Sequence, residues 1–172
     1  MATSNLSWTL LTEGIELLGS DAAVVSDVGR SRVHQSYVNW SYDLAVGASA
    51  SLGPSDNPRG IVGAVVDELF SRREMHGVET VSSVPWAYLN LPPLVARRQQ
   101  ASPDALALVI LSVCEVLRPS IPFYYAALPG AAAVRFQKDD YDVTMLLAPN
   151  EPVEEWTPRR LRERYGITEA PN

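Results

Sequence analysis

Residues 38–46 alternate between apolar and polar or small side chains, and this pattern limits the folds open to the chain more than any other. The residues that would point to one face are Val38, Trp40, Tyr42, Leu44 and Val46. Alternation of this kind predicts a half-buried β-strand, because successive side chains of a strand point to opposite faces. A single strand cannot satisfy its own backbone, so we expect partner strands and a covering layer of helices.

Further strand signals complete an expected α+β fold in a single domain over residues 1–172. The stretch 22–28 is apolar and β-branched and is followed by Gly29-Arg30-Ser31, which predicts a short strand forming a hairpin with the long one. A meander is predicted in the last third, with strands at 123–128, 132–137 and 141–147. We therefore expect one antiparallel sheet, flat or curved, built from residues 22–50 and 123–147.

Helix signals predict two longer helices that cover mainly one face of this sheet. Asn57 and Pro58 are a cap and first residue for one helix, which Gly77 would end. Ser102 and Pro103 start the other, which runs to residue 117 and is apolar on nearly every side, as expected of the centre of a core. Short helices near the two termini, around residues 8–18 and 157–166, are expected at the rim.

Composition narrows the classes of function. The 172 residues carry a formal net charge of −6, and 47% of them are hydrophobic. An acidic chain is poorly suited to tracking phosphates, so we expect no nucleic acid and no membrane as partner. Cys114 is the only cysteine and the two histidines are isolated, so we expect no disulfide within the chain, no metal and no cofactor. No basic, apolar leader is visible, which favours a cytoplasmic protein.

Catalytic signals are weak. The stretch Gly47-Ala48-Ser49-Ala50-Ser51 resembles a nucleophile elbow but lacks its final glycine and its following helix, so a small-residue strand end is the preferred interpretation. His34 would lie near the start of the long strand, with Tyr42 and Asp43 as polar neighbours in the sequence. These three residues are the candidates for an enzymatic or ligand-binding pocket between sheet and helices, although no catalytic residue is assigned.

An aromatic stretch flanked by prolines is the best candidate for a functional surface. The residues expected to form an interface are Trp86, Tyr88, Leu89, Leu91, Leu94, Arg97 and Arg98. Aromatic side chains and arginine are enriched where proteins meet, and proline lowers the entropy lost on docking. An equally favoured alternative is that the aromatic rings pack back onto the core.

The leading expectation for function is therefore a non-enzymatic interaction or assembly protein. It would bind a protein partner or itself, as a homo-oligomer, through the aromatic stretch or an edge strand. A structural component or a neutralising partner would both fit. The alternative is a small enzyme or small-molecule-binding domain with a pocket near His34.

Overall fold

The computed structural model describes residues 27–53, 57–77, 95–96, 98–138, 141–147 and 153–166. These residues form a mixture of helices and strands, as the α+β prediction requires. In chain order the elements are α2 (Asp27–Ser49), α3 (Pro58–Asp67), the π-helical turn η1 (Glu68–Arg72), β1 (His76–Gly77), β2 (Gln100–Ala101), α6 (Pro103–Leu117), β3 (Phe123–Leu128), β4 (Ala131–Lys138), β5 (Tyr141–Leu147), β6 (Glu154–Trp156) and α7 (Pro158–Tyr165). The helix predicted around residues 8–18 lies outside the described residues.

The strand prediction for residues 38–46 is wrong, because these residues belong to helix α2, which also runs through Gly29-Arg30-Ser31. The buried residues of its central and C-terminal part are Tyr37, Ser41, Leu44, Ala45 and Ala48. They recur every three or four positions, so they form one stripe along a helix. Two of them are alanine and one is serine, and such small residues add little to a pattern read from large apolar side chains. The hairpin predicted between residues 22–28 and this segment loses its second strand for the same reason; residues 22–26 lie outside the described residues, and residues 27 and 28 belong to α2.

The meander prediction is confirmed, and it supplies the main sheet. The sheet has the order β3-β4-β5-β6 with every neighbouring pair antiparallel. Pro129 and Gly130 connect β3 to β4, and Gly130 has a φ of 70°, a left-handed conformation that glycine adopts without a steric penalty. The short β6 was not predicted, and residues 27–50 contribute no strand to the sheet.

Three helix starts were predicted correctly from a capping residue followed by proline. The side chain of Asn57 accepts a hydrogen bond from the Gly60 amide at 3.1 Å, and Ser102 and Thr157 cap α6 and α7 in the same way. The predicted end of the second helix is wrong. Helix α3 passes into η1 and stops at Arg73, so that His76 and Gly77 form strand β1 instead of a helix terminus.

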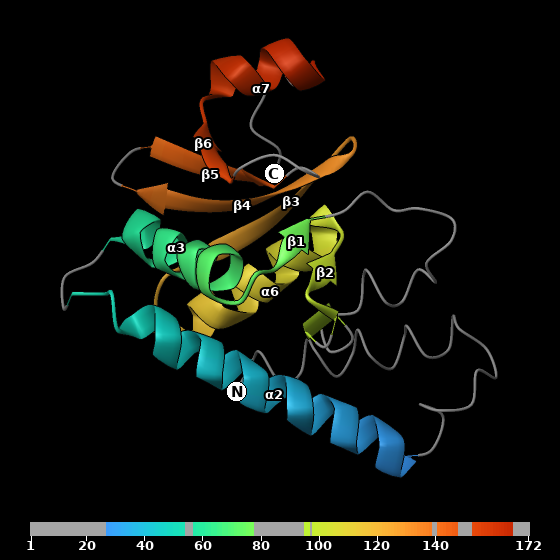
Figure 1. Cartoon of the computed structure of the whole chain (residues 1–172). Coiled ribbons are helices and arrows are strands. Elements are labelled where there is room, and N and C mark those ends of the chain that lie inside the picture. The colour runs from blue at the N-terminus through green and yellow to red at the C-terminus, as the bar shows by residue number, and fades with distance from the viewer. Residues whose placement is uncertain are drawn as a thin grey trace.

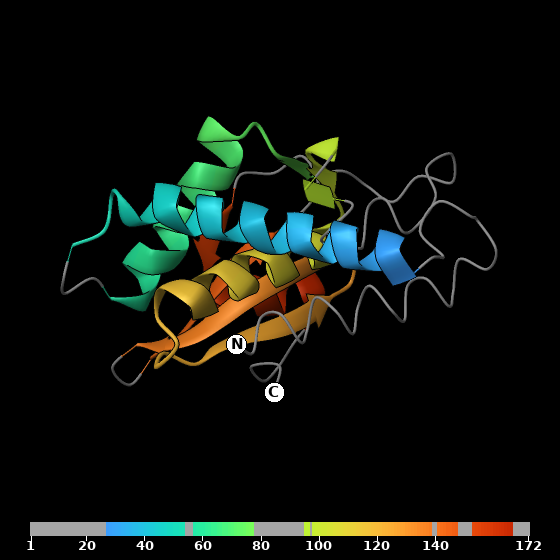
Figure 2. The same cartoon turned by 90° about the horizontal axis from the view of Figure 1, so that it is seen from below.

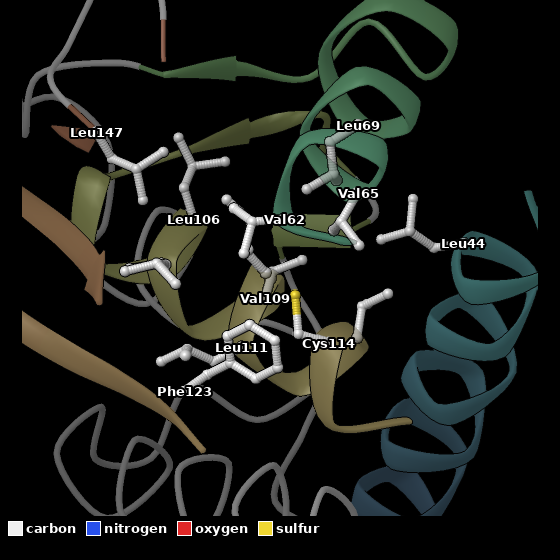
Figure 3. Packing of buried hydrophobic residues seen from close by; sticks show 14 of the residues in the cluster. Leu44, Val62, Val65, Leu69, Leu106, Val109, Leu111, Cys114, Phe123 and Leu147 are labelled. Atoms are coloured by element: carbon white, nitrogen blue, oxygen red, sulfur yellow. The ribbon is translucent and has the colours of Figure 1, made fainter. Parts of the chain in front are cut away.

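The helices form layers on the two sides of the sheet (Figure 1). Helix α6 lies against the sheet and also contacts α2 and α3, and α2 crosses it on the side away from the sheet (Figure 2). Ten of the fifteen residues of α6 are buried, which confirms it as the centre of the core. Side chains from α2, α3, η1 and the sheet converge on it, among them Leu44, Val65, Leu69 and Phe123 (Figure 3).

The expectation that the C-terminal helix lies at the rim of the sheet is wrong. Helix α7 packs on the face of the sheet opposite to α6. Trp156 and Leu161 form a second buried cluster with Ala126, Leu128 and Ala133 of the sheet. Arg160 and Arg164 lie over the Trp156 ring, with their guanidinium carbons 4.5 and 5.3 Å from its centre. The sheet is thus covered on both faces, which leaves its edges as the places where backbone groups can be open. Within the described residues, no helix is both long and apolar enough to cross a bilayer.

Candidate functional site

The candidate pocket residues His34, Tyr42 and Asp43 all lie on helix α2. His34 and Asp43 are nine residues apart, which in a helix is two and a half turns, or about 13 Å along the axis, and places them on opposite sides. Tyr42 and Asp43 are exposed, and the Tyr42 side chain is 56% accessible. The helix therefore does not bring His34 and Asp43 together.

The stretch resembling a nucleophile elbow is the C-terminal part of α2. Its serine hydroxyl is engaged locally, since Ser49 donates a hydrogen bond to the carbonyl oxygen of Val46 at 2.8 Å. Gly47 has a packing role that is unrelated to nucleophilic chemistry. A Cβ at this position would lie 2.3 Å from the Glu68 carboxylate oxygen Oε1, so only glycine lets that carboxylate lie against the helix.

The expected interface falls almost wholly outside the described residues. This applies to Trp86, Tyr88, Leu89, Leu91, Leu94 and Arg97. Arg98 is described, and it is exposed at the end of a short helical segment just before β2. The interface assigned to this stretch therefore stays a prediction.

A buried carboxylate connects α2 to η1, and the sequence reasoning missed it. Glu68 is only 7% exposed, and it accepts hydrogen bonds from Arg72 Nη1 at 3.1 Å and Arg73 Nε at 3.3 Å. The Arg73 guanidinium also lies over the Trp40 ring at 5.9 Å. Burying a carboxylate is costly unless it is paired, so the two arginines are what allow Glu68 to occupy this place.

Arg73 also adjoins two residues with left-handed backbones: Glu74, which follows it in the chain, and Gln99, which is hydrogen-bonded to it. Glu74 has a φ of 52° and Gln99 a φ of 57°, a region that non-glycine residues seldom occupy. Gln99 Nε2 donates to the Arg73 carbonyl oxygen at 3.0 Å, and the His76 amide donates to the Gln99 carbonyl oxygen at 2.8 Å. These bonds accompany the parallel pairing of β1 with β2 and hold residues 73–77 beside residues 99–101. Glu68, Arg72, Arg73 and Gln99, together called the Glu68 clamp, therefore connect segments that are far apart in the chain.

A sequence signal for Glu68 did exist. Glu68 lies three residues after Val65 and seven after Ile61, on the same helical stripe as these buried side chains. A charged residue on an apolar stripe predicts a buried, paired group. The glycine that makes room for it, Gly47, lies 21 positions earlier and gives no local sign of its partner.

The two edges of the main sheet differ in how they are protected against pairing with another strand. Strand β6 is three residues long and contains Glu154 and Glu155. Short, charged edge strands discourage further pairing. Strand β3 is six residues long, Phe-Tyr-Tyr-Ala-Ala-Leu, with no charged residue and no proline, and its register with β4 runs without a bulge. In the described part of the chain, its only strand neighbour is β4.

The open side of β3 can be identified from its turn. A two-residue turn makes Leu128 and Ala131 a hydrogen-bonded pair, so every second residue of β3 directs its N–H and C=O at β4. The residues between them, Phe123, Tyr125 and Ala127, direct their N–H and C=O at the free edge. Two tyrosines of this strand are among the exposed large side chains, Tyr124 at 56% and Tyr125 at 39%. Among the residues that the structure describes, this edge thus combines unpaired backbone groups with accessible aromatic rings.

Tyr125 is held in place from the α6 side of the sheet. Its hydroxyl donates a hydrogen bond of 2.5 Å to Asp104 Oδ1 in the first turn of α6. Partial burial, the hydrogen bond to Asp104 and the negative charge of Asp104 together raise the pKa of Tyr125 to about 12. Tyr125 therefore stays protonated at neutral pH and serves as a fixed hydrogen-bond donor.

Cys114 is fully buried in the middle of α6. Burial, and to a smaller extent the charge of Glu115, raises the pKa of this thiol far above its usual range. A thiol that cannot ionise is a poor nucleophile and a poor metal ligand, so Cys114 acts as a core residue. Among the described residues, no group of three or more His, Cys, Asp or Glu side chains is arranged to hold a metal ion.

Comparisons with protein-family models, with curated proteins and with solved structures find no significant match to this chain. Function therefore has to be argued from the chain's own surface. The described residues offer two distinct features, the buried Glu68 clamp and the open β3 edge. The Glu68 carboxylate is paired with two arginines, whereas the outward backbone donors and acceptors of β3 have no partner among the described residues.

Proposed function

We propose that this protein is a non-enzymatic assembly protein that associates with itself by extending its sheet at strand β3. The observation that carries this proposal is the contrast between the two sheet edges, since β6 is short and acidic whereas β3 is long, uncharged and regular. Unprotected edge strands are templates for pairing with another chain, and native proteins normally block them.

The side chains at this edge support the same function. Tyr124 and Tyr125 are exposed, and tyrosine is among the residue types that contribute most to binding energy where proteins meet. The net charge of −6 would oppose contact between most surfaces of two copies. The absence of charge along β3 makes it a place where two acidic chains can approach.

Replacement of Ala127 by proline tests the proposal. The Ala127 amide points to the free edge, so proline there removes a donor that β4 does not use, and prolines are tolerated on edge strands of this orientation. We expect the wild type to show a mass above the 18.8 kDa of one chain in light scattering after size exclusion. The Ala127→Pro variant should elute as a monomer, while the matched Ala127→Val control, which keeps its amide, should associate as the wild type does.

Circular dichroism of all three proteins establishes that the variants are folded. A wild type that is monomeric at every concentration tested would exclude self-association. An oligomer that persists in folded Ala127→Pro would show that association uses another surface, such as the predicted aromatic stretch containing Trp86.

A further inference from the structure

We infer that the partner at β3 is a second copy of this chain, paired antiparallel about a two-fold axis that passes midway between the Tyr125 residues of the two copies. This inference rests on the proposed function and adds the occupant, the symmetry and the register. It follows from matching the open backbone groups of one β3 strand to those of another.

The backbone allows few registers. In an antiparallel pair, two opposite residues either both direct their N–H and C=O at each other or both direct them away. The outward residues Phe123, Tyr125 and Ala127 must therefore face outward residues of the second copy. With the axis at Tyr125, Phe123 faces Ala127 of the second copy and Tyr125 faces its own equivalent. Every outward N–H and C=O of β3 is then paired, and a shift in either direction leaves at least one residue unpaired.

The ends of the strand limit the pairing to this length. Pro122 precedes β3 and Pro129 follows it, and neither has an N–H to donate. A register with the axis at Ala126 would place Phe123 opposite Pro129 of the second copy and lose that donor. A register with the axis at Tyr124 would leave Ala127 beyond the end of the opposing strand.

Side-chain sizes fit the same register. On the α7 side of the sheet, Tyr124 faces Ala126 of the second copy, in a pair that does not share hydrogen bonds and in which side chains approach closely. A large ring against a small side chain avoids a clash there. On the α6 side the two Tyr125 rings lie side by side, each held by its own Asp104. Facing aromatic pairs stabilise antiparallel strands.

A cysteine scan along β3 reads this register directly. Cys114 is fully buried, so the wild type is the control without an accessible thiol. Three variants are oxidised separately under identical conditions, Tyr124→Cys, Tyr125→Cys and Ala126→Cys. Only at position 125 do the two equivalent Cα atoms lie about 5.5 Å apart, within the range of a disulfide. We expect Tyr125→Cys to form a covalent dimer at least about ten times faster than the other two, because their equivalent positions are diagonal and about 7–8 Å apart.

The outcomes separate the inference from the proposed function. If the wild type associates but Tyr124→Cys or Ala126→Cys crosslinks fastest, the two β3 strands pair in another register. The inference is then overturned, although the proposed function stands. An associating wild type in which none of the three crosslinks uses a different partner strand or surface, which also overturns the inference. A wild type that never associates removes the proposed function itself.

A second measurement, dityrosine crosslinking, leaves an aromatic ring at positions 124 and 125 in every protein compared. Each tyrosine is either kept or replaced by phenylalanine. Photo-oxidation with a ruthenium complex and persulfate, which removes one electron from each of two adjacent phenols, joins their rings as dityrosine. We expect the wild-type dimer to crosslink, Tyr125→Phe to lose most of this product and Tyr124→Phe to retain most of it. Equal loss in the two phenylalanine variants would contradict the placement of Tyr125 at the axis.

Discussion

Substitution of Gly47 by alanine tests the link between α2 and the buried carboxylate. In an isolated helix this change is stabilising, by up to about 1 kcal/mol, because glycine is a poor helix former. Here the added Cβ would lie 2.3 Å from Glu68 Oε1 and 2.5 Å from Glu68 Cδ. The carboxylate would have to move away from α2 and from its two arginines.

The expected magnitude follows from three contributions. Forcing an extra methyl group against a packed side chain costs about 1–3 kcal/mol. Weakening the bonds from Arg72 and Arg73 costs up to about 1 kcal/mol each, and less for Arg72, which is half-exposed. The gain in helix propensity offsets about 1 kcal/mol of this. We expect Gly47→Ala to lower the free energy of unfolding by about 2 kcal/mol.

Urea denaturation of four variants measures this effect and its cause. In a Glu68→Ala background the obstacle is gone, so Gly47→Ala should become stabilising by up to about 1 kcal/mol. Gly63→Ala on α3 is the matched control, because a Cβ there meets no atom within 4 Å, and it should stabilise the wild type by a similar amount. If Gly47→Ala stabilises the protein equally in both backgrounds, the contact between Gly47 and Glu68 does not constrain α2 and the reasoning fails.

Three further predictions concern other parts of the molecule. The pKa of Tyr125, about 12, lies above the value near 10 expected in the unfolded chain, so its contribution to stability is complete below pH 10 and is lost as the pH rises towards 12; Asp104→Asn should lower this pKa in a spectrophotometric titration. Cys114 should not react with a thiol reagent such as dithionitrobenzoate in the folded protein and should react fully in urea, and a fast reaction under native conditions would contradict its burial. Leu161→Ala should lower the free energy of unfolding by about 2–3 kcal/mol if α7 is part of the cooperative fold, whereas the exposed neighbour Arg162→Ala should change it by less than about 0.5 kcal/mol in the same assay.

The candidate site could be predicted from the sequence only in part. The alternation in 123–128, 132–137 and 141–147 placed the meander correctly, and an edge strand was one of the two surfaces proposed for association. Which strand would be the open edge depended on the number of strands in the sheet. That number changed once residues 38–46 were found in a helix and β6 was added after β5.

The starts of three helices were decided by neighbouring residues along the chain. Asn57, Ser102 and Thr157 each precede a proline, and each caps its helix through a bond to an amide three residues ahead. Such bonds span only a few residues, so they form in the same way whatever the rest of the chain does. The turn at Gly130 belongs to the same class, because its left-handed φ is a property of one residue.

Residues 38–46 had no such local instruction, since their large apolar side chains follow a strand period, and two of them, Tyr42 and Val46, are exposed on the helix. Packing against α6 and α3 selected the helix, because it buries Tyr37, Leu44 and Ala48 on one stripe. The same packing brought Glu68 to Gly47 and left β3 at the edge of the sheet. These outcomes depend on contacts between residues far apart in the chain. Local sequence patterns therefore predict where elements begin and end, but not which of their faces and edges stay open.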